Sequence, residues 1–237
     1  AITAQVLALG GNVLAFDRDA AGLAQLSDDF PAVGGQLLIC AGSITAQDDN
    51  RRALDMVLSS FGRLDGLVNN AAVVQPAMLH KMTREAWDRV IETDLTGPYL
   101  LLQICAQHWI AAHGSDPSQS ATIVNIASEA ARNGVVGQIN YAAAKAGLLG
   151  MTVSAARELA RYGVRANAVS FGLVETPMTQ LVLNDAQKRE RILAGVVLGR
   201  VAQPAEVAAP VCFLLSPAAR YITGQILGAN GGAYISI

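Results

Sequence analysis

Three residues whose chemistry fits proton transfer lie close together in the sequence: Ser128, Tyr141 and Lys145. Tyr141 and Lys145 are four residues apart, so on a helix both side chains project from one face and the ammonium lies near the phenol. At about 4 Å and an effective dielectric of about 20, that charge favours the phenolate by about 4 kcal/mol, roughly 3 pKa units. The pKa of the tyrosine would then fall from about 10 to about 7, where a phenol exchanges protons with an alcohol or ketone oxygen.

Ser128 is predicted at the end of a strand, where its hydroxyl can hold the same substrate oxygen as the phenol of Tyr141. The spacing of Tyr141 and Lys145 is also compatible with a coincidental pair on a helix. The pattern of strands and helices around these residues is therefore needed to distinguish the two interpretations.

Short apolar runs alternate along the chain with segments of helical period, which is typical of βα units around a parallel sheet. The pattern predicts one α/β domain over residues 1–237, with a doubly wound parallel sheet whose strands are buried on both faces. We expect strands at residues 12–16, 36–40, 66–69, 122–126, 165–170 and 225–227. We expect helices at residues 48–61, 83–113, 141–162 and 204–215, with Asp48 and Thr83 as N-caps and Pro204 at a first helical position.

Residues 1–9 read as the end of a helix, which Gly10 and Gly11 terminate before the strand at residues 12–16. This pattern predicts that the sequence starts within a βαβ unit, and we expect a further strand upstream of Ala1. That strand would be central in a doubly wound sheet, and without it two neighbouring strands would each have an unpaired edge.

Composition excludes several classes of function. The net charge is −2 and no long basic run occurs, so nucleic acid is not an expected partner. Charged residues, glycine or proline interrupt every apolar run before the roughly 18 residues of a spanning helix, so no membrane association is expected. The three histidines lack metal-ligand spacing, and a metal site is not indicated. Three separated cysteines in apolar sequence, Cys40, Cys105 and Cys212, fit reduced thiols of a cytoplasmic protein.

Several motifs together resemble the short-chain dehydrogenase/reductase family along essentially the whole chain. Ser128 stands thirteen residues before Tyr141, as in the Ser-Tyr-Lys arrangement of that family. The segments NNAA at 69–72, NAVSFGLVETPM at 167–178 and YITGQILGANGG at 221–232 are similar to further family motifs. The resemblance implies a Rossmann-like fold and a cytoplasmic homotetramer that buries the helices at residues 83–113 and 141–162.

The resemblance implies an NAD-dependent oxidoreductase that interconverts a small-molecule secondary alcohol and a ketone. Tyr141 would be the acid/base, Lys145 would lower its pKa and bind the nicotinamide ribose, and Ser128 would position the substrate oxygen. Asp94 stands where the family usually has an Asn whose backbone carbonyl orders a water linked to the lysine. An acid at this position could alter the proton relay.

The resemblance also implies residues of the cofactor site. Asn70 and Ala71 would lie beside the cofactor at a strand end, while the Val174 backbone and Thr176 would hold the nicotinamide carboxamide. The glycine-rich turn that would cradle the pyrophosphate is absent, and we expect it upstream of Ala1 together with the further strand.

Asp17 ends the strand at residues 12–16, where a carboxylate can accept both hydroxyls of the adenosine ribose and would repel a 2′-phosphate. NAD is therefore favoured over NADP. Two observations leave alternatives open: Asp17 could instead cap the following helix, and the adjacent Arg18 could neutralise a phosphate.

The substrate pocket of the family maps to Ala130 and Gln138 and to the segment at 179–198. Arg132 could bind a carboxylate there, although a solvated surface arginine is the simpler interpretation.

Two other functions remain open. One is an NADPH-dependent reductase of 3-ketoacyl thioesters, against which Asp17 argues. The other is a catalytically weak nucleotide-binding or scaffold protein, favoured by the absent glycine-rich turn and by departures from the family pattern at Asp94, Ser43, Phe171 and Asn230.

Overall fold

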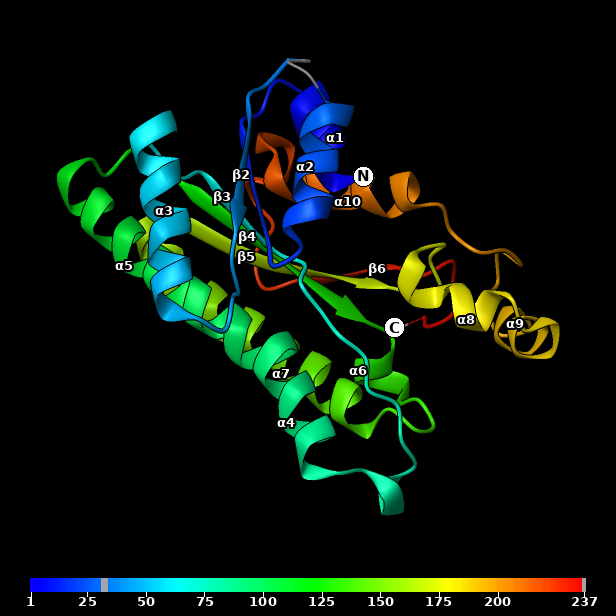
Figure 1. Cartoon of the computed structure of the whole chain (residues 1–237). Helices are drawn as coiled ribbons and strands as arrows, with labels where there is room; N and C mark the ends of the chain where they lie inside the picture. The colour runs from blue at the N-terminus through cyan, green and yellow to red at the C-terminus, as the bar shows by residue number, and fades with distance from the viewer. Residues whose placement is uncertain (31–33, 236–237) are drawn as a thin grey trace.

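A computed structural model describes residues 1–30 and 34–235 of the chain (Figure 1). Its strands pair in parallel, and every run predicted as a strand is one, with shifts of a few residues at the ends. They are β1 (Val13–Asp17), β2 (Leu37–Ala41), β3 (Gly66–Asn69), β4 (Ala121–Ser128), β5 (Val164–Phe171) and β6 (Ile226–Ala229). The predicted α/β class with parallel strands and flanking helices is therefore confirmed.

The strands form two hydrogen-bonded ladders, β1-β2 and β3-β4-β5-β6. Among the described residues, β1 pairs with β2 and β3 pairs with β4, and β1 and β3 share no ladder. The prediction that every strand is buried on both faces holds for β4 but is wrong for β1, where four residues are half-buried and Asp17 is exposed. The two strands differ in burial because β4 lies inside its ladder with helices on both faces, whereas β1 belongs to a two-stranded ladder.

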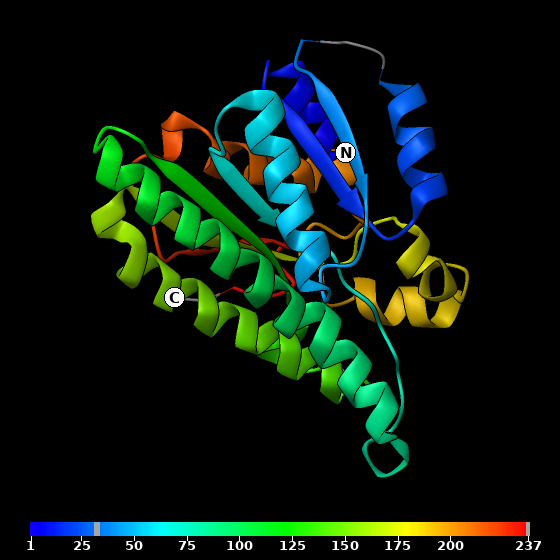
Figure 2. The ribbon, with the colours of Figure 1, turned by 60° about the vertical axis from the view of Figure 1, so that its left-hand side comes forward.

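Helices cover both faces of the four-stranded ladder (Figures 1 and 2). On one face, α5 and α7 pack on β3, β4 and β5, and α3 packs against α5. On the other face, α10 packs on β4 and β5, and α1 packs against α10. The helices are α1 (Ile2–Ala8), α2 (Ala20–Asp29), α3 (Gln47–Phe61), α4 (Arg84–Ile91), α5 (Gly97–Ser115), α6 (Ala130–Asn133), α7 (Ile139–Leu159), α8 (Gln180–Leu183), α9 (Ala186–Leu193) and α10 (Pro204–Leu215).

Successive side chains of β4 point to opposite faces of the ladder, so the core consists of two clusters. Ile123 packs with α5 and α7 residues such as Trp109 and Leu159, whereas Val124 packs with α10 residues such as Val211. Both strand residues are fully buried. This two-sided packing holds the end of β4 in place, and Ser128 is its last residue.

The helix predicted at residues 83–113 is continuous from Arg84 to Ser115, but it is not a regular α-helix throughout, because a π-helical segment at Glu92–Thr96 lies between α4 and α5. Pro98 has no N–H to donate to the carbonyl of Asp94, and its ring would clash with that carbonyl in a regular α-helix. The wider turn avoids this conflict and leaves Asp94 fully buried. Such bulges occur often at functional sites.

The predicted helix starts are correct at Thr83, whose hydroxyl accepts from the N–H of Ala86, and at Pro204. The prediction of Asp48 as an N-cap is wrong. Helix α3 begins at Gln47 after Ala46, and Asp48 lies in its first turn, where an acidic side chain still complements the helix dipole.

Candidate active site

Parallel strands end at one edge of a sheet, and the chemistry-bearing residues follow those ends. Ser128 ends β4, Asp17 ends β1, and Asn70 and Ala71 come directly after β3. Tyr141 and Lys145 lie in α7, which packs on β4 and β5. The fold therefore brings the predicted catalytic residues together.

Ser128, Tyr141 and Lys145 meet as their spacing predicted. The Lys145 Nζ lies 5.5 Å from the centroid of the Tyr141 ring, one helical turn away. The Ser128 hydroxyl accepts from the N–H of Ala130 at 3.2 Å, and a hydrogen bond with Ser128 lowers the pKa of Tyr141. The serine can therefore hold an oxygen that also faces the phenol.

The predicted pKa of about 7 for Tyr141 is contradicted by the structure. Burial raises the pKa of Tyr141 to about 12, and this outweighs the hydrogen bond with Ser128. The negative charge of Asp94 raises it further. The estimate from spacing counted the charge of Lys145 but neither the desolvation of the phenol nor a nearby carboxylate.

Lys145 is almost fully buried and has two partners other than the phenol. Its Nζ donates to the carbonyl oxygen of Ile126 at 3.1 Å and lies 3.6 Å from Asp94 Oδ2. Burial lowers the pKa of Lys145, while the Asp94 carboxylate raises it. Much of the ammonium's charge is thus directed at groups other than Tyr141.

Asp94 is fully buried, and its two carboxylate oxygens differ. Oδ1 accepts from the N–H of Val73 at 2.8 Å, which connects the π-helical segment to the chain after β3. Oδ2 faces Lys145 and has no hydrogen-bond partner in the described structure. Burial raises the pKa of Asp94, and Lys145 lowers it. The side chain at this position thus contacts the lysine directly.

Two groups of buried amides support the site, and of their members the sequence analysis had included only Asn69, in the NNAA motif. Asn69 donates to Asn125 at 2.8 Å, and Asn125 donates to Thr152 at 2.8 Å, which links β3, β4 and α7. Asn140 donates to the carbonyl oxygens of Gln75 and Ala86 and thus fixes the start of α7. The signal for Asn125 was present, because it is a lone amide in an otherwise apolar strand.

Asp17 is exposed at the end of β1, where its carboxylate can reach a ligand at the sheet edge. Its Oδ1 accepts from the N–H of Asp19 at 3.0 Å. The alternative role as an N-cap belongs to Asp19, whose side chain accepts from the N–H of Gly22. A carboxylate here suits the hydroxyls of a ribose, so the residues at this edge fit a dinucleotide.

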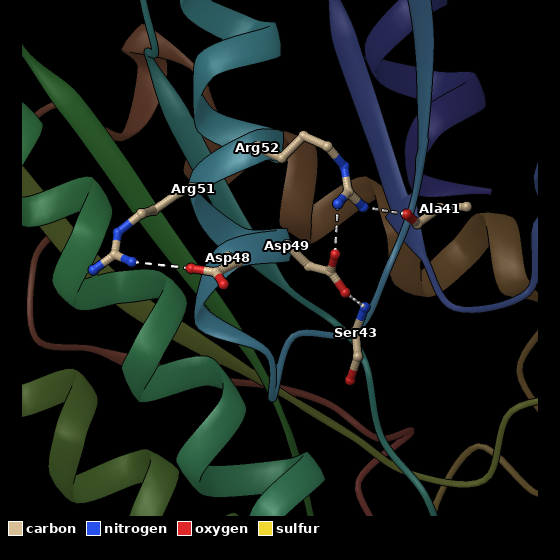
Figure 3. A network of polar contacts seen from close by, with 6 residues as sticks. All are labelled: Ala41, Ser43, Asp48, Asp49, Arg51 and Arg52. Carbon is tan, nitrogen blue, oxygen red and sulfur yellow. Dashed lines mark hydrogen bonds and ion pairs between the residues drawn. The ribbon is translucent and has the colours of Figure 1, made fainter.

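The loop after β2 is connected to the first turns of α3 by a polar network (Figure 3). Arg52 donates to the carbonyl oxygen of Ala41 and pairs with Asp49, whose other oxygen accepts from the N–H of Ser43. A Cβ on Gly42 would come within 2.8 Å of the Phe16 ring, so a larger residue there would displace that side chain. Asp49 therefore orders the backbone at Ser43.

The remaining predicted residues lie in the loops beyond β4 and β5. Val174 is buried and forms a bridge with Ala202, while Thr176 caps a short turn through Thr179. Ala130 is buried in α6, and Gln138 is half-buried at the start of α7.

Arg132 stacks on the ring of Tyr234, with its guanidinium carbon 4.8 Å from the ring centroid. This contact occupies one face of the guanidinium and favours a structural role for Arg132.

In the described part of the chain, no group of three or more His, Cys, Asp or Glu side chains is placed to hold a metal ion. The helices described there include none that is long and apolar enough to cross a membrane.

A family model described as Enoyl-(Acyl carrier protein) reductase matches residues 1–234. The chain is 37% identical over 226 residues to the 3-oxoacyl-[acyl-carrier-protein] reductase of Thermotoga maritima, a match that covers 95% of this chain and 89% of the relative. It is 39% identical over 212 residues to the protein of that name from Vibrio cholerae, with coverages of 90% and 83%.

Solved structures agree with these matches. The 3-ketoacyl-(acyl-carrier-protein) reductase of Brucella melitensis complexed with NADH has a TM-score of 0.90 at 29% identity, covering 99% of this chain and 92% of that one. A short chain dehydrogenase from Bacillus anthracis has a TM-score of 0.87 at 28% identity, with coverages of 99% and 91%. The comparisons give no support to the prediction of a further strand and glycine-rich turn upstream of Ala1.

Proposed function

Because the chain is an oxidoreductase that belongs to the short-chain dehydrogenase/reductase family, we propose that it reduces the ketone of a 3-oxoacyl thioester. The observation that carries the chemistry is the placement of Tyr141 beside Lys145 and Ser128 at the carboxyl edge of the sheet. The names of the relatives from Thermotoga maritima and Vibrio cholerae support the thioester substrate. They favour it over the simple secondary alcohol that was the main expectation from the sequence.

Each side chain has a distinct task in this reaction. A bound nicotinamide dinucleotide supplies the hydride that reduces the carbonyl carbon. The Tyr141 hydroxyl donates its proton to the carbonyl oxygen, and the Ser128 hydroxyl holds that oxygen in place. The Lys145 ammonium stabilises the phenolate left on Tyr141 until a proton returns from solvent. Asp17 would hold the adenosine ribose, and Asn70, Ala71, Val174 and Thr176 would surround the nicotinamide end.

The substrate is tested by measuring dinucleotide oxidation with a 3-oxoacyl thioester, the free 3-oxo acid of the same chain length, and unbranched and cyclic ketones. We expect kcat/KM for the thioester to exceed that for the other compounds by at least about tenfold, a ratio that specific pocket contacts readily supply. Equal or better turnover of simple ketones would instead support the secondary-alcohol interpretation. Dinucleotide binding without turnover of any compound would support a scaffold role.

We expect Asp17→Ser to lower the kcat/KM ratio of NADH over NADPH at least tenfold, about 1.4 kcal/mol. The substitution removes a carboxylate that accepts ribose hydroxyls and repels a 2′-phosphate. The measurement is the initial rate with each dinucleotide at saturating ketone. Asp19→Asn is the matched control, because it removes a charge two residues away but keeps a capping side chain. An unchanged ratio in Asp17→Ser, or an equal fall in the control, would refute the assignment.

The homotetramer predicted from the sequence is supported by apolar side chains exposed on the outer faces of α5 and α7, among them Tyr99, Ile110 and Val153. Burying such faces between copies is the usual outcome for helices of this kind. We expect sedimentation at micromolar concentration to give a tetramer, or at least a dimer. A single species of 24.7 kDa would contradict the proposal.

The cytoplasmic location expected from the sequence is supported by Cys40, Cys105 and Cys212, which are all free and buried. Cell fractionation tests it, and recovery of the protein outside the cytoplasm would contradict it.

A further inference from the structure

The carboxylate of Asp94 has a feature that the proposed reaction does not use. It is fully buried, its Oδ2 has no hydrogen-bond partner in the described structure, and that oxygen lies 3.6 Å from the Lys145 ammonium. A buried carboxylate oxygen without a hydrogen bond is costly, so the nearby positive charge is its main compensation. Asp94 therefore acts on Lys145 mainly through its charge.

Lys145 is the cation on which both Asp94 and Tyr141 depend. Its ammonium lies 3.6 Å from the carboxylate and 5.5 Å from the centroid of the phenol ring. A phenolate on Tyr141 would need this ammonium as its counter-ion, but a carboxylate already neutralises it. In a buried site the competition is strong, because water screens it weakly.

We infer that the Asp94 carboxylate adds to the burial that keeps Tyr141 protonated, by competing with Tyr141 for the charge of Lys145, which makes Asp94 a positioning residue that sets the site for ketone reduction. The inference rests on the proposed function, since a protonated phenol is the form that donates to a carbonyl oxygen. The rise that Asp94 causes in the pKa of Tyr141 agrees with it.

The other charged groups on the elements around α7 do not take part in the interaction between Asp94, Lys145 and Tyr141. In the described residues, Asp94 is the one charged group that shifts the pKa of Tyr141 or of Lys145. On α4 and the π-helical segment the charged side chains other than Asp94 reach the surface, and Arg84 pairs with Asp88 there. Three further charged side chains have partners of their own. Glu129 accepts from Ser170 and Asn230, Arg132 stacks on Tyr234, and Arg165 donates to the carbonyl oxygens of Leu214 and Ile222. The two histidines of α5, His108 and His113, lie toward the C-terminal end of that helix.

The test compares the pH profiles of wild type and Asp94→Asn. The amide removes the charge but keeps an oxygen for the N–H of Val73, so the loop after β3 retains its contact. Reduction needs the phenol and fails as pH rises through the pKa of Tyr141, whereas oxidation needs the phenolate and rises through the same pKa. We expect both breaks, the pH at which reduction fails and the pH at which oxidation rises, to fall by at least about one unit in Asp94→Asn, because the substitution removes the carboxylate 3.6 Å from the Lys145 ammonium and leaves that charge to the phenol.

Asp88→Asn is the matched control, because it removes a carboxylate from the neighbouring α4 that pairs with Arg84 at the surface. We expect its pH breaks to coincide with those of wild type. Unmoved breaks in Asp94→Asn, or an equal shift in Asp88→Asn, would overturn the inference. Asp94→Ser, which leaves room for a water to accept from Val73, is a second neutral variant and is expected to shift the breaks in the same direction.

A readout without turnover separates this inference from the proposed function. Tyrosine labelled at its Cζ carbon allows the ionisation of Tyr141 to be followed by NMR in the NAD-bound protein, with Tyr141→Phe assigning the signal. We expect the signal of Tyr141 to titrate at lower pH in Asp94→Asn than in wild type. The same titration in both would overturn the inference even if the reaction is confirmed, while a shift without thioester turnover would overturn only the proposed substrate.

Discussion

Replacing Tyr141 with Phe is expected to lower kcat by about 10²- to 10⁴-fold, the usual contribution of a general acid or base. The substitution removes one hydroxyl and keeps the ring that packs beside Lys145. The dissociation constant of the dinucleotide should change little, because the loss concerns proton donation to the substrate. Steady-state kinetics and a fluorescence titration with the dinucleotide measure the two effects.

Tyr221→Phe is the control for this result, since Tyr221 is fully exposed and loses the same hydroxyl. Its turnover should equal that of wild type. Near wild-type turnover in Tyr141→Phe would refute the assignment of Tyr141 as the proton donor.

Replacing Lys145 with Ala is expected to lower turnover and weaken dinucleotide binding together, because we assign the ammonium to both the phenolate and the ribose. It also leaves Asp94 as a buried carboxylate without its cation. Breaking a buried pair in this way typically costs about 3–5 kcal/mol of unfolding free energy. Denaturant unfolding and the two kinetic measurements test the three losses.

The double variant Lys145→Ala/Asp94→Asn separates the electrostatic loss from the loss of lysine packing. We expect it to be more stable than Lys145→Ala, because no buried charge remains, so the two substitutions should be clearly non-additive. Its turnover should stay low, since the counter-ion of the phenolate is still missing. Additive losses would mean that the two side chains do not interact.

The stability of Lys145→Ala should also depend on pH in a defined direction. Burial already raises the pKa of Asp94 in the wild-type fold, and removing the cation that lowers it raises it further. A carboxyl whose pKa is higher in the folded than in the unfolded protein stabilises the fold when protonated. Lys145→Ala should therefore be most stable at acid pH and lose stability as pH rises through the folded pKa of Asp94. A flat profile would contradict this.

The sequence by itself identified the features that depend on neighbours along the chain. Tyr141 and Lys145 share a face because helical geometry places residues four apart side by side, whatever the rest of the fold does. The strands were recognised as short apolar runs, and α10 was placed at residues 204–215 because proline at a first helical position and the apolar period are local signals. The three residues at the centre of the site follow from these local rules.

Tertiary structure decided the electrostatics of the site. Asp94 is buried in the π-helical segment at Glu92–Thr96, and the packing of α7 on β4 brings Lys145 to Asp94 from a distant part of the chain. Burial then raises the pKa of Tyr141 to about 12, where spacing alone predicted about 7. Desolvation and long-range charge pairs depend on which surfaces pack together, and periodicity carries no information about that. For this reason the sequence predicted Tyr141, Lys145 and Ser128 as the centre of the site, whereas only the folded chain shows the Asp94 carboxylate 3.6 Å from the Lys145 ammonium.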